Sequence, residues 1–410
     1  MKSRIILRSA LLPGLLLAVG TAFSNGLTPQ EELGKSIFFD QNLSVNNNQS
    51  CATCHGPAAG WTGPDTSINA FGAVYEGSVP GRFGDRKPPS SAYATPSPIL
   101  HFVMEKKDEL FVGGNFWDGR ATGETLGSPA AEQAQGPFLN PLEQSLPDAA
   151  EVVSRICASS YGTLFTDVCG AEACAAGNTA AAYDCVGFAI AAYEGSPESN
   201  QYSSKYDAYL AGKVQLTKLE KQGLNLFKSK GKCAACHVLD PGPNGEPPLL
   251  TDFTFDNLGI PRNPDNPFYT QEFNPLGYAW LDPGLGGFLA VRPDYAAYAD
   301  ENRGKHKVPT LRNVDKWDES LGPKVKAFGH NGYFKSLEQI VHFYNTRDAK
   351  PVCANNFTRV EEALAQGCWP QPEIPVNVNS AELGDLKLTP AQEAAIVAFM
   401  KTLSDGYMAP

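Results

Sequence analysis

The chain has 410 residues and is acidic, with 33 Lys and Arg against 44 Asp and Glu and a formal net charge of −11. At roughly 150 residues per domain, this length predicts two or three domains. The acidic balance argues against a nucleic-acid partner, because a phosphate-binding surface needs an excess of Lys and Arg. The 39 glycines and 32 prolines indicate a loop-rich protein, and the 10 cysteines are too few for a disulfide scaffold.

The N-terminus has the pattern of a cleavable secretory signal. Basic residues precede the apolar stretch 9–22, and small residues follow it, so cleavage is expected after Ala22 or Ser24. The stretch is short for a membrane span and contains a Pro and a Gly. We therefore predict a signal peptide over residues 1–24 and a mature protein without a membrane span. Its expected location is the periplasm, where disulfides persist.

The mature chain contains an imperfect internal repeat. Leu27–Phe38 and Leu216–Phe227 share a Leu-Thr-x-x-Glu-x-x-Gly pattern, and each precedes a C-x-x-C-H pentapeptide. The Thr-x-x-Glu of each copy is a capping box, which predicts a helix that ends before a Cys-rich loop. A third helix is expected from Thr389 to about Leu403. The duplication predicts two mainly α domains, 25–200 and 201–410, joined near the polar stretch Ser196–Ser204.

The two C-x-x-C-H pentapeptides carry the strongest chemical signal. Two thiols three residues apart can form thioethers to the vinyl groups of one porphyrin, and the adjacent His can ligate its iron. Zinc would need four ligands in a regular pattern, and a redox dithiol does not need a trailing His twice. The motifs predict two covalently bound haem c groups. The residues that would hold them are Cys51, Cys54, His55, Cys233, Cys236 and His237.

The second axial ligand of each iron decides its chemistry. Composition alone does not assign these ligands. The remaining candidates are His101, His306, His330, His342, Met104, Met400 and Met408. Two long segments rich in Pro and Gly, Gly60–Pro98 and Pro241–Pro293, show little periodicity. Loops of this length usually carry function or wrap a cofactor.

Beyond these motifs, the sequence resembles the bacterial di-haem cytochrome c peroxidase family, which includes MauG. The matching segments run in order over nearly all of the mature chain. They are Leu33–Asp40 with the first haem motif, Phe116–Arg120, Gln133–Glu143, the second haem motif, Val308–Asn313 and His330–Tyr344. The resemblance implies a mainly α, loop-rich fold of two cytochrome c-type domains, each built around one covalent haem.

In that family the N-terminal haem reacts with peroxide and the C-terminal haem transfers electrons. The resemblance implies that Glu143 is the distal acid–base carboxylate, with Gln133 and Pro137 in the same pocket. It also implies that Trp117 bridges the haems. A positioned carboxylate can move a proton between the two oxygens of peroxide, as cleavage of the O–O bond requires. The stretch from Trp117 to Gln133 exceeds the family's usual spacing, so a loop insertion is expected.

Two departures indicate the MauG-like branch, to which the related enzyme MbnH also belongs. Peroxidases of the family carry a Met fourteen residues after the position of His330, where this sequence has Tyr344. A phenolate is a hard anionic donor that lowers the potential of iron. The resemblance therefore implies Tyr344 as the distal ligand of the second iron; the alternative is that it packs in an amphipathic helix. No His lies between His55 and His101, which implies a five-coordinate first haem that needs no reductive activation.

The family commonly binds calcium between its domains, with an Asn before a Ser/Thr-Pro pair. Here Ala94 precedes that pair, and the carbonyl-donating stretch at Val325–Ala327 is altered. These departures place a calcium site in question.

Six cysteines lie outside the haem motifs, enough for up to three disulfides with 15 connectivities. Cys353 with Cys368 is the expected pair, because the other four cluster far away in sequence.

Three functions are compatible with these observations. The first is a MauG-like enzyme that uses hydrogen peroxide to form a high-valent iron state and oxidises a Trp or Tyr side chain of a periplasmic protein at long range. The second is a cytochrome c peroxidase that takes electrons from a small cytochrome c or cupredoxin. The third is an electron-transfer cytochrome without peroxide chemistry. Tyr344 argues against the second, and the Gln133–Glu143 pair argues against the third.

Overall fold

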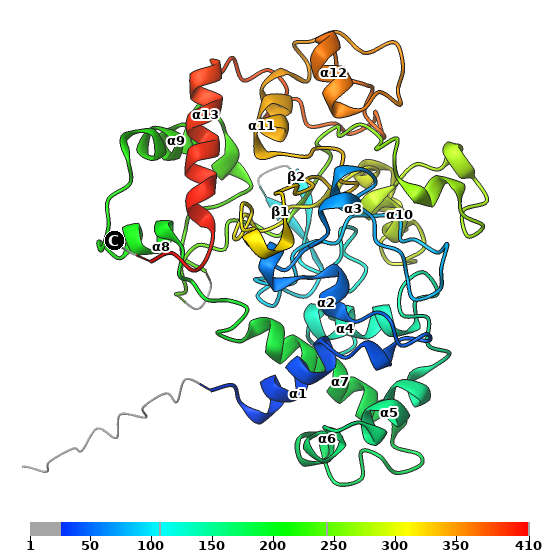
Figure 1. Ribbon diagram of the computed structural model, residues 1–410. Helices are drawn as coiled ribbons and strands as arrows, with labels where there is room; N and C mark the ends of the chain where they lie inside the picture. Colours follow the sequence, from blue (N-terminus) through cyan, green and yellow to red (C-terminus); the bar gives the residue numbers. More distant parts are fainter. Residues whose placement is uncertain (1–25, 106–107, 243–244, 409–410) are drawn as a thin grey trace, which may run out of the picture.

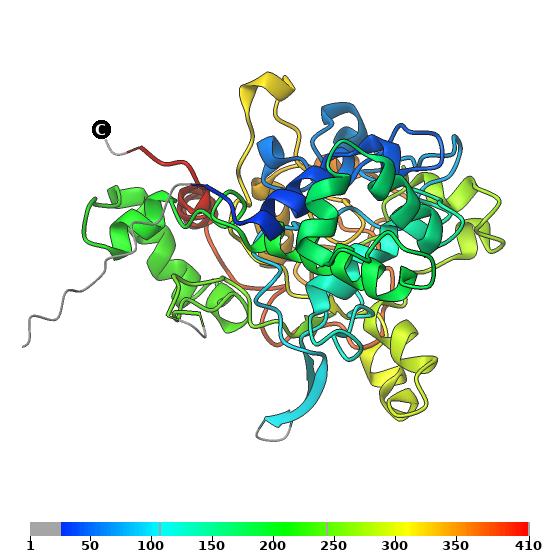
Figure 2. The same cartoon turned by 90° about the horizontal axis from the view of Figure 1, so that it is seen from below.

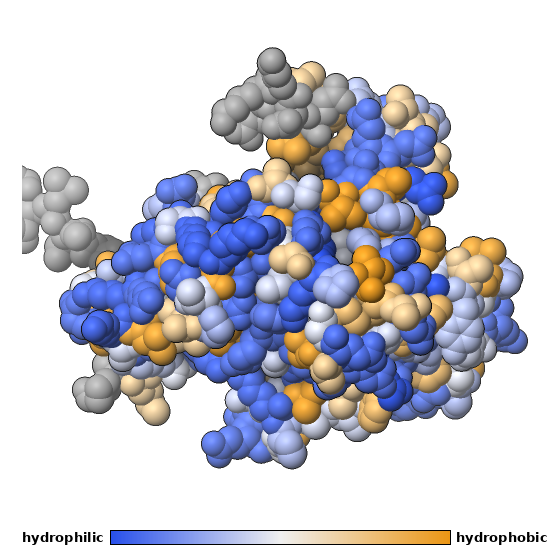
Figure 3. All heavy atoms as spheres, turned by 90° about the horizontal axis from the view of Figure 1, so that it is seen from above, coloured by the Kyte–Doolittle hydropathy of each residue, from blue (hydrophilic) through white to orange (hydrophobic). Residues whose placement is uncertain are grey.

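The computed structural model describes residues 26–105, 108–242 and 245–408, so the predicted signal peptide lies outside the described residues. As predicted, the fold is mainly α and loop-rich, with short helices separated by long irregular segments (Figure 1). Among the described residues, no helix is long and apolar enough to cross a bilayer. On the face seen in Figure 3, hydrophilic residues predominate and hydrophobic residues form separate small groups.

Both copies of the repeat form the helix that their capping boxes predict. Helix α1 spans Pro29–Phe38, and helix α9 spans Lys218–Lys228. In each copy the Thr side chain accepts from the backbone of the Glu three residues on, and the Glu side chain accepts from the Thr backbone. Helix α13, Pro390–Met400, has an equivalent cap at Thr389 and continues into a 3-10 turn, Lys401–Leu403. All three helix predictions are confirmed.

Each repeat helix crosses a helix from the far end of its own half of the chain. Helix α1 contacts α7 (Thr179–Gly195), and α9 contacts α13 (Figure 1). Both crossings require glycine. A Cβ atom at Gly34 would lie 1.9 Å from the Ala189 carbonyl oxygen, and one at Gly223 would lie 1.9 Å from that of Ala395. Since the two glycines hold the same place in the repeat, the duplication preserves the close helix crossing as well as the helix.

The N-terminal half is completed by helices that surround α7. They are α4 (Pro129–Leu139), α5 (Ala149–Ala158) and α6 (Gly162–Cys169). Two disulfides, Cys157–Cys174 and Cys169–Cys185, tie this bundle together.

In the C-terminal half, helices α8, α11 and α12 accompany the α9–α13 pair. They span Lys205–Leu210, Leu337–Thr346 and Val360–Gln366. The predicted disulfide Cys353–Cys368 is confirmed.

The strands are few and short. Strands β1 (His101–Glu105) and β2 (Asp108–Val112) form an antiparallel hairpin, with His101 opposite Val112, and this hairpin projects from the body of the protein (Figure 2). Near the base of the hairpin, the Phe102 ring lies 4.8 Å from that of Tyr298. Strand β3 (Phe255–Asp256) pairs with β4 (His306–Lys307).

The remaining elements are short helical segments. The short α-helices are α2 (Cys51–Cys54), α3 (Thr66–Ala70) and α10 (Gly284–Ala290), and the other 3-10 turns are Gln41–Leu43, Pro57–Ala59, Cys233–Ala235, Pro267–Thr270, Gly277–Ala279, Ala296–Tyr298, Asp300–Asn302 and Glu319–Leu321.

The α9–α13 crossing supplies a first prediction. Gly223→Ala should lower the free energy of unfolding by about 1–3 kcal/mol, because the added methyl group must push two backbones apart. Denaturant unfolding of the haem-loaded protein, followed by circular dichroism, measures this loss. Gly26→Ala is the control, since nothing lies within 4 Å of a Cβ at Gly26. Equal stability of the two variants would contradict the tight crossing.

Candidate functional site

A single cavity joins the two C-x-x-C-H motifs. Every predicted site residue except Cys51 lines it, and the lining comes from both halves of the chain. These residues are Cys54, His55, Trp117, Gln133, Pro137, Glu143, Cys233, Cys236, His237 and Tyr344. Cys51 lies one helical turn before His55, on α2, where it packs against the N-terminal core.

The two motif histidines are held in matching ways. The Nδ1 atom of His55 lies 3.3 Å from the Trp61 carbonyl oxygen, and that of His237 lies 2.9 Å from the Leu250 carbonyl oxygen. Burial lowers the pKa of each imidazole to about 4. Each ring is therefore neutral at physiological pH. A neutral imidazole that donates one N–H to a carbonyl offers its other nitrogen to a metal ion.

The four motif cysteines are free thiols, whereas the other six cysteines form disulfides. Burial raises the pKa of Cys51 and of Cys233 to about 12. Because a redox dithiol needs an accessible thiolate, these environments argue against the redox alternative.

Two buried ammonium groups line the same cavity. Lys87 Nζ lies 2.8 Å from both Thr62 Oγ1 and the Pro88 carbonyl oxygen. Lys307 Nζ donates to Ser97 Oγ and to the Gly114 carbonyl. Neither ammonium has a carboxylate partner among the described residues, and burial lowers the pKa of each to about 7.

Burying a cation without an anion is costly, so this cavity suits a ligand that carries negative charge. The propionate groups of haem carry such charge, and the motif residues offer thiols and imidazoles for its attachment. The residues present therefore fit two haem groups.

Glu143, Gln133 and Pro137 converge at the end of helix α4. Pro137 lies inside this helix and has no N–H, so the Gln133 carbonyl lacks its helical partner. The Asn140 side-chain amide donates to Glu143 Oε1 at 2.7 Å. Burial raises the pKa of the Glu143 carboxyl, while the Arg120 guanidinium and the Asn140 amide oppose this rise. The arrangement provides a buried carboxyl that can exchange a proton within the cavity.

Trp117 is held by both halves of the chain. Its indole is 8% exposed, and its Nε1 atom donates to the Lys87 carbonyl oxygen at 2.7 Å. The Lys307 backbone N–H donates to the Trp117 carbonyl oxygen at 2.8 Å. This ring is therefore fixed in the wall of the cavity that both motifs share.

Tyr344 projects from helix α11 into the cavity that His237 also lines. Burial raises the pKa of its phenol, and the thiols of Cys233 and Cys236 add to this rise. Its hydroxyl forms no hydrogen bond with any residue that the structure describes.

The other candidate ligands are mostly excluded by position. His101 is exposed on the projecting hairpin, Met104 is 62% exposed and Met408 is 87% exposed. Among the methionines of the described chain, Met400 alone lines the cavity, from helix α13.

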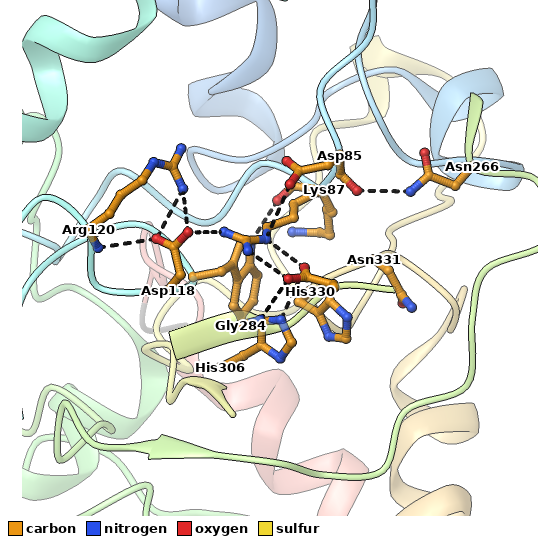
Figure 4. Close-up of polar contacts among 12 residues, drawn as sticks. Asp85, Lys87, Asp118, Arg120, Asn266, Gly284, His306, His330 and Asn331 are labelled. Carbon is orange, nitrogen blue, oxygen red and sulfur yellow. Dashed lines mark hydrogen bonds and ion pairs between the residues drawn. The ribbon is translucent and has the colours of Figure 1, made fainter. Parts of the chain in front are cut away.

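A buried network of charges links the two halves beside the cavity (Figure 4). Arg86 donates to Asp118 Oδ2 at 2.6 Å and to both oxygens of Asp282, at 2.6 and 2.7 Å. The same Asp282 lies 3.1 Å from His306 Nε2. The rings of His306 and His330 are stacked, with centroids 3.6 Å apart.

This network accounts for two of the remaining histidines. Asp282, His306 and His330 could together surround a metal ion. However, Arg86 Nε already lies 2.6 Å from the Asp282 oxygen that faces His306, so a metal there would meet a guanidinium. The arginine and His306 together hold the pKa of Asp282 well below its usual range.

Sequence reasoning did not identify Arg86 or Asp282 as site residues, and it named His306 only as one of several candidate iron ligands. The only sequence signal was that Arg86 and Asp282 lie in the two long loop segments, which are expected to carry function.

Removal of Arg86 should show how much the network contributes to the free energy of unfolding. Arg86→Met leaves the buried Asp282 carboxylate without its arginine partner, while Asp118 keeps Arg120, and should destabilise the protein by about 3–5 kcal/mol. Without the arginine, burial raises the folded-state pKa of Asp282 above its unfolded value. Protonation then relieves the cost, so the loss should be larger at pH 8 than at pH 5.

Thermal unfolding across this pH range gives the test, with Arg359→Met as the control. Arg359 pairs with Asp265 at the surface, where such a pair contributes about 0–1 kcal/mol. A pH-independent loss in Arg86→Met would contradict the assignment.

Known proteins are similar to this chain over most of its length. The family model described as di-haem cytochrome c peroxidase matches residues 28–215. The chain is 34% identical over 376 residues to the methylamine utilization protein MauG of Paracoccus denitrificans (strain Pd 1222), covering 91% of this chain and 88% of MauG. It is 25% identical over 382 residues to the cytochrome-c peroxidase IdrP2 of Pseudomonas sp. (strain SCT), covering 91% and 80% of the two chains.

A solved structure shares the fold over most of its length. The diheme peroxidase BthA of Burkholderia thailandensis E264 has a TM-score of 0.74 and 28% identity, covering 93% of this chain and 87% of BthA. With two haem motifs opening onto one cavity and a likeness to MauG that spans nearly the whole chain, this protein belongs to the di-haem cytochrome c peroxidase family and is a haem-dependent, peroxide-using oxidoreductase.

Proposed function

We propose that this protein uses hydrogen peroxide at the His55 haem and oxidises a Trp or Tyr side chain of a partner protein at long range, as the MauG-like branch does. The observation that carries the proposal is Tyr344, which lies in the cavity beside the second haem motif where electron-accepting peroxidases of the family have Met. A tyrosine ligand lowers the potential of a haem, which makes it a poor acceptor of electrons from a small donor protein. The likeness to MauG supports the same choice.

The bound haem groups supply the redox chemistry, and the chain supplies protons, orientation and a route between the haems. Glu143 accepts the proton of one peroxide oxygen and returns it to the other, with the Gln133 side chain in the same pocket. Trp117, fixed by hydrogen bonds from both halves, is the bridge for electron transfer between the haems. The predicted signal peptide and three disulfides support a periplasmic location, where the partner would also reside.

A second candidate is a cytochrome c peroxidase that takes electrons from a small cytochrome c or cupredoxin. Met400 favours it, because this thioether also lines the cavity and would raise the potential of a haem that it ligated. The named cytochrome-c peroxidases among the relatives support it as well.

The first experiment is low-temperature EPR and optical spectroscopy of the ferric haem-loaded protein, before and after stoichiometric peroxide. The proposal predicts one high-spin and one low-spin haem, and peroxide should convert both to a long-lived EPR-silent state. Two low-spin haems that react with peroxide only after one-electron reduction would identify a cytochrome c peroxidase. No peroxide reaction in any redox state would leave an electron-transfer cytochrome.

The ligand assignment is tested by exchanging Tyr344. Tyr344→Met should raise the potential of the low-spin haem and reduce oxidation of the partner by at least tenfold, because a thioether replaces a phenolate. Redox titration of each haem measures the shift. Met400→Leu is the matched control and should leave both potentials unchanged. If Met400→Leu changes the potential and Tyr344→Met does not, Met400 is the ligand. That result would favour the cytochrome c peroxidase function.

The acid–base role of Glu143 has a pH signature. The carboxyl must begin as a carboxylate to accept the peroxide proton, and burial raises its pKa above the ordinary 4.5. The rate of peroxide reaction should therefore fall as the pH drops through that raised value. Glu143→Gln should react about 10²–10⁴-fold more slowly and lose this acidic limb. Stopped-flow mixing with peroxide gives both readouts, and an unchanged limb in the variant would assign the proton transfer to another group.

A further inference from the structure

Lys326 is a buried cation that the proposed function does not use. Its side chain is 5% exposed. Its Nζ atom donates to the carbonyl oxygens of Ala59, Asn313 and Lys316, at 2.8, 2.7 and 3.2 Å. No carboxylate pairs with it among the residues that the structure describes. The ammonium is thus held by backbone carbonyls alone.

These carbonyls come from the segments that support the two haem motifs. Ala59 closes the turn after His55, in the same loop as the Trp61 carbonyl that His55 contacts. Asn313 is the last residue of the segment Val308–Asn313. In this segment, Thr310 Oγ1 donates to the Leu249 carbonyl oxygen. The next residue, Leu250, has the carbonyl oxygen that His237 contacts. Lys326 therefore connects the loop after His55 with the segment that contacts the loop after His237.

The approach of the two loops is built into the backbone. Gly60 has a φ of +75°, and a Cβ atom there would lie 2.7 Å from the Asn313 carbonyl oxygen and 3.1 Å from Lys326 Nζ. A residue with a side chain would be strained by the backbone angle and would enter the space where the carbonyls converge.

Carbonyl oxygens that converge from irregular backbone are the ligands that a hard cation such as Ca²⁺ prefers. The family resemblance implies a calcium ion between the domains, but this carbonyl cluster does not fit one. The Lys326 ammonium occupies the carbonyl cluster, and Lys87 contributes a second buried positive charge close enough to repel it. A divalent ion there would meet the Lys326 ammonium, and the carboxylate nearest in the same environment, that of Asp315, is already paired with Lys324.

We propose that the Lys326 ammonium replaces a bridging metal ion, so that this protein joins its two haem-binding loops with a cation of its own and needs no calcium. In this role Lys326 is a positioning residue, acting through the loop after His55 and through the Asn313 segment, which contacts the loop after His237. The inference rests on the di-haem architecture alone, so it stands or falls independently of which partner is oxidised.

The first test is the metal content and metal response of the haem-loaded protein. Elemental analysis of the protein as purified, before any chelator is added, should find no stoichiometric calcium. The EPR spectrum and the thermal unfolding midpoint should be the same with EGTA and with millimolar Ca²⁺. One calcium per chain whose removal changes the spectrum or lowers the midpoint would overturn the proposal.

The second test removes the ammonium. Lys326→Met should lower the thermal unfolding midpoint by several degrees and shift the potentials of both haems, because both loops lose the same anchor. Lys324→Met is the matched control, since Lys324 is a surface residue paired with Asp315. If the two variants have the same midpoint and the same potentials, Lys326 does not join the loops.

The third test asks whether the emptied carbonyl cluster takes up a cation. In Lys326→Ala, ammonium or Ca²⁺ should raise the unfolding midpoint, whereas neither should do so in the unaltered protein. Absence of any cation effect in a folded Lys326→Ala protein would count against the carbonyl cluster as a cation site. If this variant does not fold, the calcium measurement on the unaltered protein still decides the proposal.

Discussion

The walls of the cavity are loops, so the structure depends on hydrogen-bond partners for the buried backbone N–H and carbonyl groups of those loops. A helix pairs its own N–H and carbonyl groups, but an irregular segment must find partners elsewhere. Here buried side chains provide them: the Asn263 amide donates to the carbonyls of Phe71, Gly72 and Asn331, and the Asn257 amide donates to those of Ile374 and Val376. Most of these contacts join distant parts of the chain, so loops that would be mobile alone become a fixed wall.

Burial also requires partners for the charged side chains around the cavity. Arg86 joins Asp118 of one half to Asp282 of the other, while Lys87 and Lys307 present ammonium groups that have no carboxylate partner within the described residues. The protein therefore balances some of the charges that line the cavity with its own carboxylates and leaves the charges of Lys87 and Lys307 unbalanced. A cofactor that brings acidic groups completes the balance, which ties the stability of the fold to its prosthetic groups.

Local features of this fold could be predicted from the sequence. Capping boxes, the C-x-x-C-H motifs and the Cys353–Cys368 disulfide involve residues that lie close together in the chain, so their spacing carries the information. The convergence of Trp117, Glu143 and Tyr344 on one cavity was expected only through the family resemblance. The partners of Arg86 and Lys326 could not be predicted, because Asp282 lies 196 residues from the first and Ala59 lies 267 residues from the second. No periodic pattern in the sequence indicates contacts between residues that lie so far apart.

The glycine crossings have a consequence for how the chain is made. Helix α1 meets α7, and α9 meets α13, so each half closes by bringing its beginning against its end. Contacts of such high sequence separation form slowly, since a long loop must close first. Neither half can finish its core until its last helix has been synthesised. Each C-x-x-C-H motif comes early in its half, after α1 or α9, so both pairs of thiols stay accessible until the last helix packs.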